Sequence, residues 1–479
     1  MDALAGTWTK ITNSPPSGVG LMELLSDGTV MVQNGESATW YRLTPDIHGS
    51  YVNGTWTTLS FMNDTRLYNS TQVLTDGRLF TAGGEYGTGD SNAEVYDPML
   101  NAWTRTPSSG QKFSDSVSEM LGNGNVLIAP VSGPDSTIIY NPTANSWTTG
   151  PVTLHGQDEV PWVKLPDGSI LTVDGSSQAE RYIPSLNQWV ADANTPVVMF
   201  SGGETGCGHM LANGTAFFRG YTHTVIYTPS GTSSPGTWVQ GPDIPNGLNC
   251  GDSPGCVMAN GKVLFAAGPG YLTGPTSFFE YDPVQNSMTQ VNGPSGQTLS
   301  TVPYGLRMLA LPDGGVFMND GGTLYEYVST GSALSAWQPT ISSITHNSDG
   351  SYLLTGTLLN GFSEGAAYGD DWQMATNRPL VRFTDSSGNV YYARTFNWSS
   401  TGGANGKHSR HHAIQSPAES SRWHLLGGGR GQWHRVGSHF AHHPLRARRC
   451  RTNGRDTRSR VAHNSHGHDD RTLGARRGQ

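Results

Sequence analysis

A pair of turn residues, Asp-Gly or Asn-Gly, recurs along this chain at nearly even spacing. The pair occurs seven times, and the successive glycines are 49, 47, 44, 46, 47 and 53 residues apart. Such a period is typical of proteins built from repeated supersecondary units. Each pair separates two apolar segments, which predicts a β-hairpin with a type I′ turn and a positive φ at both central residues. The pairs are Asp27-Gly28, Asp76-Gly77, Asn123-Gly124, Asp167-Gly168, Asn213-Gly214, Asn260-Gly261 and Asp313-Gly314.

Two aromatic positions recur in step with the turns. A tyrosine follows the strand after each turn, and in five units a proline two residues later stops that strand, because proline cannot donate to a ladder. A tryptophan closes each unit, with Met288 in its place once. Because these aromatic residues recur in every unit, they are expected to pack between units and not to form one binding or catalytic site. The tyrosines are Tyr41, Tyr96, Tyr140, Tyr182, Tyr227, Tyr281 and Tyr327, and the tryptophans are Trp56, Trp103, Trp147, Trp189, Trp238 and Trp337.

Seven units of four short strands predict an all-β, seven-bladed β-propeller, in which radial closure protects the edges of the sheets. The Asp-Gly hairpin, the Gly83-Gly84 pair and the Tyr96-Asp97-Pro98 segment resemble kelch repeats. From Ala5 to about Pro339 the arrangement resembles the propeller of the galactose oxidase and glyoxal oxidase family. That resemblance implies that a further tryptophan strand, at residues 6–11, closes the ring by pairing with the last blade.

The pattern changes after Pro339, where the chain looks like the immunoglobulin-like domain that follows the propeller in those oxidases. A sandwich of that kind takes about 100 residues, and only 64 lie between Pro339 and Gly402 inclusive. We therefore predict a kelch propeller at 1–338, a truncated immunoglobulin-like β-sandwich at 339–402 and a tail at 403–479. The expected strands are Ile341–Thr345, Tyr352–Thr357, Leu380–Thr384 and Val390–Asn397.

The formal net charge of −8 combines two different segments. Residues 1–402 carry 14 Lys+Arg against 33 Asp+Glu, whereas residues 403–479 carry 15 against 4, together with 11 of the 16 His. The acidic body disfavours nucleic acid as a partner, because phosphates need basic groups. No run of 18 apolar residues predicts a membrane span. The tail is poor in apolar residues and is expected to be disordered. Three interpretations of it stay open: an out-of-frame translation of the coding DNA, a basic arm, or a His-rich metal-binding tract.

The family resemblance implies a test for copper, which those oxidases hold with two tyrosines and two histidines, one tyrosine being cross-linked to a cysteine. Tyr68, in the segment Arg66-Leu67-Tyr68, matches the first tyrosine, and Val19 stands where the cysteine would be. Tyr304 matches the second tyrosine, but Gly305 replaces the adjacent histidine. The other histidine belongs to the C-terminal domain, in the region that this chain has lost or replaced. We therefore expect no copper, no other metal ligand set and no catalytic residue. Tyr68 and Tyr304 either pack in the core or line a pocket.

Carboxylates recur where the inner strands begin, eight residues before the turn Asp or Asn. Equivalent positions of the blades lie around one end of a propeller axis, so these side chains are expected to share one opening, the axial mouth. Carboxylates around one opening repel one another unless they are solvated, protonated or neutralised by a cation such as Ca²⁺. Two interpretations stay open: hydrophilic loop residues that face solvent, or a mouth that binds a cation or sugar hydroxyls, with the two tyrosines as stacking faces. The predicted binding residues are Tyr68, Asp115, Glu159, Glu204 beside Thr205, Asp252 and Tyr304.

These observations favour a secreted, extracellular or periplasmic module that binds carbohydrate or cell-surface material without catalysis. The alternative is an enzyme that acts on carbohydrate: a degenerate copper radical oxidase, or a propeller hydrolase or lyase that uses the carboxylates. The segment Met1 to Gly6 is too short and too polar for a signal peptide, so any export signal either has been removed or never belonged to this sequence. Cys250 and Cys256 are near enough in sequence to close a small disulfide loop, which would fit an oxidising compartment. The ligand and the oligomeric state are left open.

Overall fold

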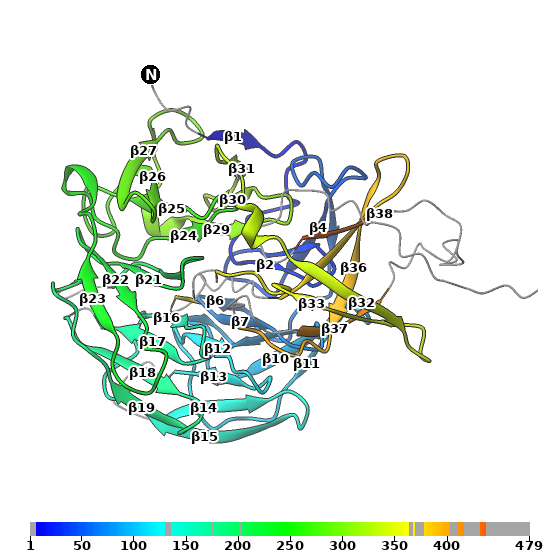
Figure 1. Cartoon of the computed structure of the whole chain (residues 1–479), viewed down its shortest axis with the longest axis horizontal. Helices are drawn as coiled ribbons and strands as arrows, with labels where there is room; N and C mark the ends of the chain where they lie inside the picture. Colours follow the sequence, from blue (N-terminus) through cyan, green and yellow to red (C-terminus); the bar gives the residue numbers. More distant parts are fainter. Residues whose placement is uncertain are drawn as a thin grey trace, which may run out of the picture. The chain divides into compact units, whose positions relative to one another are not determined.

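The computed structural model describes residues 6–129, 136–174, 176–200, 204–363, 367–368, 378–402, 410–415 and 432–436. Within them, seven antiparallel sheets of four main strands surround a common axis, which confirms the predicted all-β, seven-bladed propeller. In Figure 1 the inner strands gather around the middle of the ring and the outer strands lie towards its rim. Helical structure in these residues is limited to the short turns η1 (Pro245–Gly247), η2 (Pro303–Gly305) and η3 (Ser335–Trp337). No helix of the described part is long and apolar enough to cross a membrane.

Each blade is a meander that runs from an inner strand at the axis to an outer strand at the rim. Blade 1 is β2 (Met22–Leu24), β3 (Val30–Gln33), β4 (Trp40–Thr44) and β5 (Thr55–Thr58), and blade 2 is β7 (Ser70–Val73), β8 (Leu79–Ala82), β10 (Ala93–Asp97) and β11 (Ala102–Arg105). Blade 3 is β12 (Ser118–Met120), β13 (Val126–Ile128), β14 (Ser136–Asn141) and β15 (Ser146–Val152), and blade 4 is β16 (Pro161–Lys164), β17 (Ile170–Val173), β18 (Ala179–Ile183) and β19 (Gln188–Ala191). Blade 5 is β20 (Gly208–Met210), β21 (Ala216–Arg219), β22 (Thr224–Thr228) and β23 (Thr237–Gln240), and blade 6 is β24 (Gly255–Val257), β25 (Val263–Ala267), β26 (Thr276–Asp282) and β27 (Ser287–Val291), with β28 (Thr298–Leu299) beside β26. Blade 7 is β29 (Arg307–Ala310), β30 (Val316–Asn319), β31 (Leu324–Val328) and the N-terminal strand β1 (Thr7–Lys10).

The seven glycine turns have a different geometry from the one predicted. At Asp27-Gly28 only the glycine has a positive φ, of 77°, and its N–H donates to Leu25 O at 3.0 Å. The next residue, Thr29, accepts from the Leu25 N–H at 2.8 Å and donates its own N–H to Asp27 Oδ1 at 3.0 Å. This is a type I turn followed by a left-handed glycine. The same three hydrogen bonds recur at all seven turns, so the predicted type I′ turn is wrong.

The recurring tyrosine and the residue that closes its unit lie opposite each other on neighbouring strands in most blades. In blade 7 the partner of Tyr327 is Trp8 of β1, with ring centroids 4.7 Å apart, so the N-terminal strand closes the ring as the resemblance implied. Trp337 was predicted to close that blade, but it lies in η3, against Gly261 of the blade 6 turn. The other opposed pairs are Tyr96 and Trp103, Tyr140 and Trp147, Tyr182 and Trp189, Tyr227 and Trp238, and Tyr281 and Met288.

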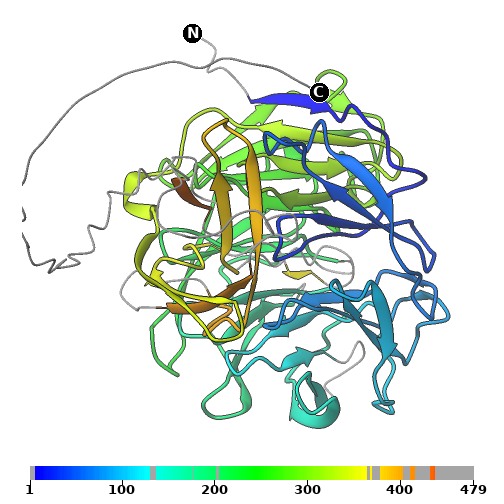
Figure 2. The same ribbon diagram turned by 90° about the vertical axis from the view of Figure 1, so that its right-hand side faces the viewer.

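Six strands after the propeller form one antiparallel sheet, in the order β32-β33-β37-β36-β35-β38. Figure 2 shows this sheet in yellow and orange. Four strands lie where they were predicted: β32 (Thr340–His346), β33 (Tyr352–Thr357), β35 (Leu380–Thr384) and β36 (Val390–Phe396). The strands β37 (Arg410–Gln415) and β38 (Gln432–Val436) fall within the predicted disordered tail, so that prediction is wrong for these two segments. The rest of 403–479 lies outside the described residues, and the immunoglobulin-like sandwich stays a prediction.

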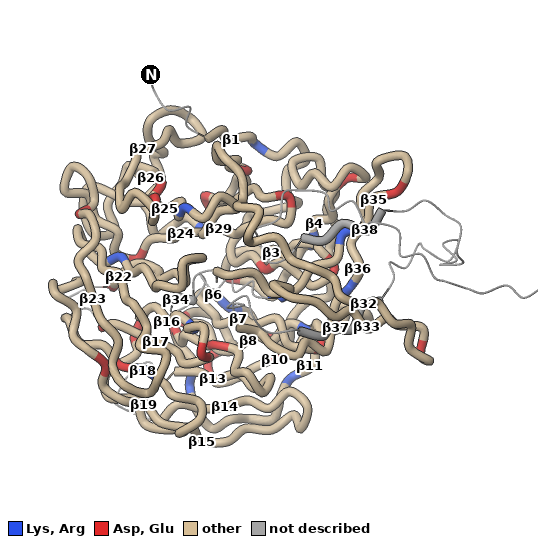
Figure 3. Tube along the Cα trace, viewed as in Figure 1, with Lys and Arg blue, Asp and Glu red and all other residues tan. Residues whose placement is uncertain are grey.

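The C-terminal sheet contacts the turn ends of blades 1 and 2. Arg394 Nη2 donates to Asp76 O, and a Cβ at Gly28 would lie 2.5 Å from the Tyr392 ring. A separate short strand, β34 (Ala367–Tyr368), pairs with the first residues of β16 and becomes a fifth strand of blade 4. Strand β34 lies beside β16 near the middle of the ring in Figure 3. The C-terminal part of the chain therefore adds backbone to the innermost layer of the propeller.

Three cysteines are buried in the propeller, and none of them is in a disulfide. They are Cys207, Cys250 and Cys256. The Cys250–Cys256 disulfide that the sequence left open is not formed, and the two thiols pack in different clusters. Burial raises the pKa of the Cys250 thiol, so this side chain behaves as a small apolar group. Cys450 lies outside the described residues.

An acidic side chain is buried beside the inner strands of blades 1 and 2. Glu23 on β2 is 1% exposed and accepts a hydrogen bond from Thr71 Oγ1 of β7 at 2.6 Å. Burial raises the pKa of Glu23 to about 7, while the charge of Arg378 and the Thr71 hydroxyl act in the opposite direction. In blade 7, burial and the nearby Asp313 raise the pKa of Glu326 to about 8. Both carboxyls therefore hold protons that they would lose on unfolding near neutral pH.

Raising the pH from 5 to 8 is expected to lower the free energy of unfolding by roughly 6 kcal/mol through Glu23 and Glu326. The folded protein binds more protons than the unfolded chain across this interval, because Glu23 and Glu326 ionise fully only after unfolding. His209 is buried with its pKa lowered from 6.5, and it opposes the trend only where the unfolded imidazole takes up a proton. Urea unfolding at both pH values measures the effect, and Glu23→Gln should make it smaller. A stability that increases between pH 7 and 8 would contradict the expectation.

Candidate functional site

Four of the predicted mouth residues share an unusual backbone conformation. Tyr68, Asp115, Glu159 and Asp252 have φ values of 56°, 43°, 46° and 44°, although residues with a Cβ rarely adopt positive φ. Each stands eight residues before the turn Asp or Asn of its blade, just ahead of an inner strand. The same strained geometry at the same repeat position shows that blades 2, 3, 4 and 6 begin alike. Their first side chains therefore leave the backbone in equivalent directions at one end of the ring.

The carboxyl groups of the mouth are near enough to change one another's ionisation. The side chains of Glu159 and Glu204 share a hydrogen bond, and burial together with Glu204, Asp252 and Asp115 raises the pKa of Glu159 to about 11. Glu159 is therefore protonated at neutral pH and donates to Glu204. The pKa of Asp158 is also raised, first by burial and then by Glu204. Acidic side chains that start in blades 3, 4, 5 and 6 thus meet around one protonated carboxyl.

The two predicted tyrosines lie near Arg307 at the start of blade 7. The Arg307 guanidinium carbon is 5.9 Å from the centroid of the Tyr68 ring. The Tyr68 and Tyr86 rings are in an edge-to-face arrangement, with their centroids 6.0 Å apart. Arg307 Nη1 also donates to Gly305 O at 3.2 Å, in the short turn η2 that contains Tyr304. Tyr68 and Tyr304 are both half-buried, so neither is a fully buried packing residue. The mouth therefore has an aromatic and cationic side, formed by blades 2 and 7, and an acidic side.

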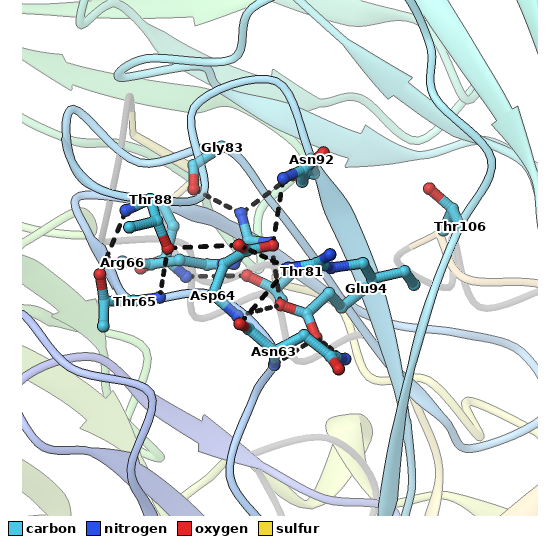
Figure 4. A network of polar contacts seen from close by, with 12 residues as sticks. Asn63, Asp64, Thr65, Arg66, Thr81, Gly83, Thr88, Asn92, Glu94 and Thr106 are labelled. Atoms are coloured by element: carbon cyan, nitrogen blue, oxygen red, sulfur yellow. Dashed lines mark hydrogen bonds and ion pairs between the residues drawn. The ribbon is translucent and has the colours of Figure 1, made fainter.

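Arg66 anchors the segment that carries Tyr68. Figure 4 shows its side chain at the centre of a polar network between the loops of blade 2. Arg66 is fully buried; Nη1 donates to Gly83 O at 2.6 Å and Asn92 O at 2.9 Å, and Nη2 donates to Glu94 Oε1 at 3.0 Å. These bonds hold β6 (Arg66–Leu67), which pairs with β9 (Tyr86–Gly87). Arg66 is thus a positioning residue for the Tyr68 side of the mouth.

The described residues do not fit a copper radical site. Gly305 has no side chain to offer in place of the imidazole, and Val19 cannot form the thioether. Arg307 also places a cation near the Tyr68 ring, which disfavours a metal cation at that position. Across the described ranges, no group of three or more His, Cys, Asp or Glu side chains is arranged to hold a metal ion. The described carboxyl groups on the acidic side of the mouth therefore do not form a Ca²⁺ site either.

Several residues of the mouth were not found from the sequence. Tyr271 hydrogen-bonds Glu204, and burial with Glu204, Asp252 and Glu159 raises its pKa. Phe200 packs on Tyr271 with ring centroids 5.1 Å apart. Phe200 and Tyr271 lie in loops of unequal length outside the repeat pattern, so alignment of the units gave no signal for them. Strand β34 was missed because its pairing with β16 joins segments about 200 residues apart.

Comparison with known proteins agrees with this architecture. A family model for the Kelch motif matches residues 66–110. Galactose oxidase of Gibberella zeae is 25% identical over 324 residues, which are 62% of this chain and 41% of that protein. The chain thus spans about two-fifths of the length of the curated relative that it matches. A solved structure, a novel fungal alcohol oxidase with catalytic diversity among the AA5 family in complex with copper, aligns with a TM-score of 0.53 at 14% identity and covers 86% of this chain and 92% of its own. The chain therefore contains a kelch motif, is related in sequence to galactose oxidase over 62% of its length, and folds as a seven-bladed β-propeller.

Proposed function

We propose that this protein is a secreted carbohydrate-binding propeller whose ligand enters the axial mouth, and that it binds without catalysis. The carrying observation is the repeated positive φ at Tyr68, Asp115, Glu159 and Asp252, which presents an aromatic ring and carboxyl groups from four blades at one end of the ring. Residues held in sparsely populated backbone regions cluster at ligand sites. Carboxylates that accept from hydroxyls, beside aromatic faces, suit a sugar. The relative named galactose oxidase supports the same ligand class.

The absence of catalysis is the second part of the proposal. It is supported by two residues that replace groups needed for the copper radical chemistry of the family. Gly305 stands in place of a histidine ligand, and Val19 stands in place of the cysteine that forms the thioether. The competing function is an oxidase, and the retained Tyr68, the retained Tyr304 and the similarity to galactose oxidase favour it. A hydrolase or lyase is favoured by one observation, the protonated Glu159 beside Glu204, which has the form of an acid-base pair.

The proposed function predicts sugar binding that depends on the charged mouth. Purified protein should be retained on a glycan array, and the triple variant Asp115→Asn, Glu159→Gln, Asp252→Asn should bind the best sugar at least about tenfold more weakly by calorimetry. Asparagine tolerates positive φ, so this variant replaces the carboxyl groups by amides with little added strain. The matched control is Asp46→Asn, Asp282→Asn, Asp349→Asn, which replaces three carboxyl groups in other turns while it keeps the side-chain carbonyl of each turn.

A peroxide assay separates the binding module from the oxidase. After loading with copper, the protein should release no hydrogen peroxide from galactose or from simple alcohols. Peroxide release above a copper-only blank would overturn the non-catalytic assignment, and silence on the glycan array would overturn the ligand class. Recovery of the protein from the cell-free medium of its source tests export, and recovery in the cytosolic fraction alone would contradict it.

A further inference from the structure

Three aromatic rings form a platform next to the acidic side of the mouth. The rings of Phe200 and Tyr221 are stacked, with centroids 5.2 Å apart and an interplanar angle of 8°. The Tyr271 ring lies 5.1 Å from Phe200 and is tilted by 52°. Tyr221 is 41% exposed, so the platform is open to solvent. The residues come from loops of blades 5 and 6, whereas the tyrosines considered for copper belong to blades 2 and 7.

Buried hydrogen-bonding atoms without a partner lie beside this platform. Asn249 is 2% exposed and its Oδ1 accepts from the Gly251 N–H, but Nδ2 has no hydrogen-bond partner among the residues that the structure describes. Thr205 is 3% exposed, and its Oγ1 likewise has no partner in the described part. A buried donor that stays unpaired costs about 1 to 3 kcal/mol. Acceptor atoms of a ligand would recover this free energy.

Gly251 lies next to three parts of this region: the Tyr271 ring, the Asn249 side-chain amide and the Glu204 backbone. A Cβ at this residue would lie 2.9 Å from Glu204 O, 3.0 Å from Asn249 Oδ1 and 3.1 Å from Tyr271 Cδ2. The Asn249 amide, the Tyr271 ring and the Glu204 backbone therefore each lie next to Gly251. We call Glu204, Asn249, Tyr271 and the Phe200–Tyr221 stack the Glu204 subsite.

The electrostatic field at the Glu204 subsite is negative. Glu204, Asp252 and Glu159 each act to raise the pKa of the Tyr271 hydroxyl, and Glu204 acts in the same direction on Asp158. These acidic groups outnumber the buried cation near them, Arg219 of β21, whose Nη1 donates to Ser253 Oγ at 3.2 Å. A ligand with a positive charge is stabilised in such a field, whereas an anionic sugar is repelled.

We propose that the Glu204 subsite binds a sugar ring that carries a free ammonium group, as in the glucosamine units of a deacetylated amino-sugar polymer. The apolar face of the ring stacks on Tyr221 and Tyr271, the ammonium group donates to Glu204 and Asp252, and a ring oxygen accepts from Asn249 Nδ2. This inference rests on the proposed carbohydrate function and adds the class of sugar. It uses none of the positions that match the copper ligands of the related oxidases.

Binding of an ammonium group has a consequence for protons. A carboxylate beside the amino group raises the pKa of the ammonium form, so the fraction of the ligand that is an uncharged amine in solution takes up a proton as it binds. A neutral sugar lacks that effect. Calorimetry in two buffers with different ionisation enthalpies measures the number of protons taken up.

The experiment compares three probes on the full chain at pH 6.5. They are a β-1,4-linked glucosamine hexamer, the fully N-acetylated hexamer and tetralysine. The glucosamine hexamer should bind at least about tenfold more tightly than either of the others, with uptake of protons. Glu204→Gln and, separately, Tyr221→Ala should each weaken that binding at least about tenfold. Phe61→Ala, at a 63% exposed ring of blade 1, is the matched control and should leave it unchanged within about twofold.

Each contrary outcome identifies what has failed. Equal affinity for the two hexamers would overturn the amino-sugar inference and leave a carbohydrate-binding mouth. Tetralysine binding as tight as that of the glucosamine hexamer would show a cation site without sugar recognition, and would also overturn the inference. Unchanged glucosamine affinity in Glu204→Gln and Tyr221→Ala would place the ligand elsewhere. If no hexamer and no sugar on the array bind, the proposed function itself fails.

Discussion

Replacing Arg66 by methionine is expected to lower the free energy of unfolding by about 3 to 5 kcal/mol. The guanidinium is fully buried, 3.0 Å from Glu94 Oε1, and its partner Glu94 is also 0% exposed. Methionine fills much of the same volume but leaves the buried Glu94 carboxylate without its cation. It also leaves the Gly83 and Asn92 carbonyls without their donor. Removing one member of a buried ion pair is costly because an uncompensated charge stays in a medium of low dielectric constant.

Arg78→Met is the matched control for Arg66→Met. Arg78 pairs with Asp76 at 2.7 Å, which is a shorter distance, but the two side chains are 31% and 38% exposed. Water screens such a pair, and its loss is expected to cost at most about 1 kcal/mol. Urea unfolding of both variants gives the comparison. Equal losses of stability would mean that burial of the Arg66 network does not set its contribution, and would contradict the fold of the loops around Tyr68.

The repeat made most of the propeller predictable, because each unit is a local meander with the same turn, tyrosine and outer strand. The turn type was predicted wrongly, since the sequence pair Asp-Gly fits both hairpin classes. In the structure the Asp or Asn side chain of each turn accepts a hydrogen bond from the N–H of the residue after the glycine, as Asp27 does from Thr29. Trp337 was assigned to the wrong strand because Trp8, 329 positions earlier, occupies the outer place of the same blade.

The candidate site could be predicted only where it follows the repeat. Asp115, Glu159 and Asp252 were found because they occupy one position of successive units. Tyr271 and Asn249 come from connecting loops, whose lengths and paths differ from blade to blade, so no periodic signal marks them. Strand β34 depends on a long-range pairing that local patterns do not encode.

The pKa of Glu159 is the largest electrostatic effect that the structure predicts. Its ordinary value of 4.5 is raised to about 11, first by burial and then by Glu204, Asp252 and Asp115. The part of this shift that is due to Glu204, Asp252 and Asp115 requires that carboxyl groups from four different blades lie close together. If the ring had another number of units, or if these strands began at opposite ends of the axis, the groups would be separated by water and the pKa of Glu159 would be lower.

Carbon-13 NMR of protein labelled at the side-chain carboxyl carbons of Glu tests the central claim most directly, since the carboxyl shift changes when the proton leaves. At pH 9.5, above the pKa of Glu23 and of Glu326, one Glu carboxyl should remain protonated, and its signal should disappear in Glu159→Gln but persist in Glu36→Gln, where an exposed Glu is replaced. Loss of every protonated Glu signal by pH 9.5 would contradict the convergence of the blades on one acidic mouth.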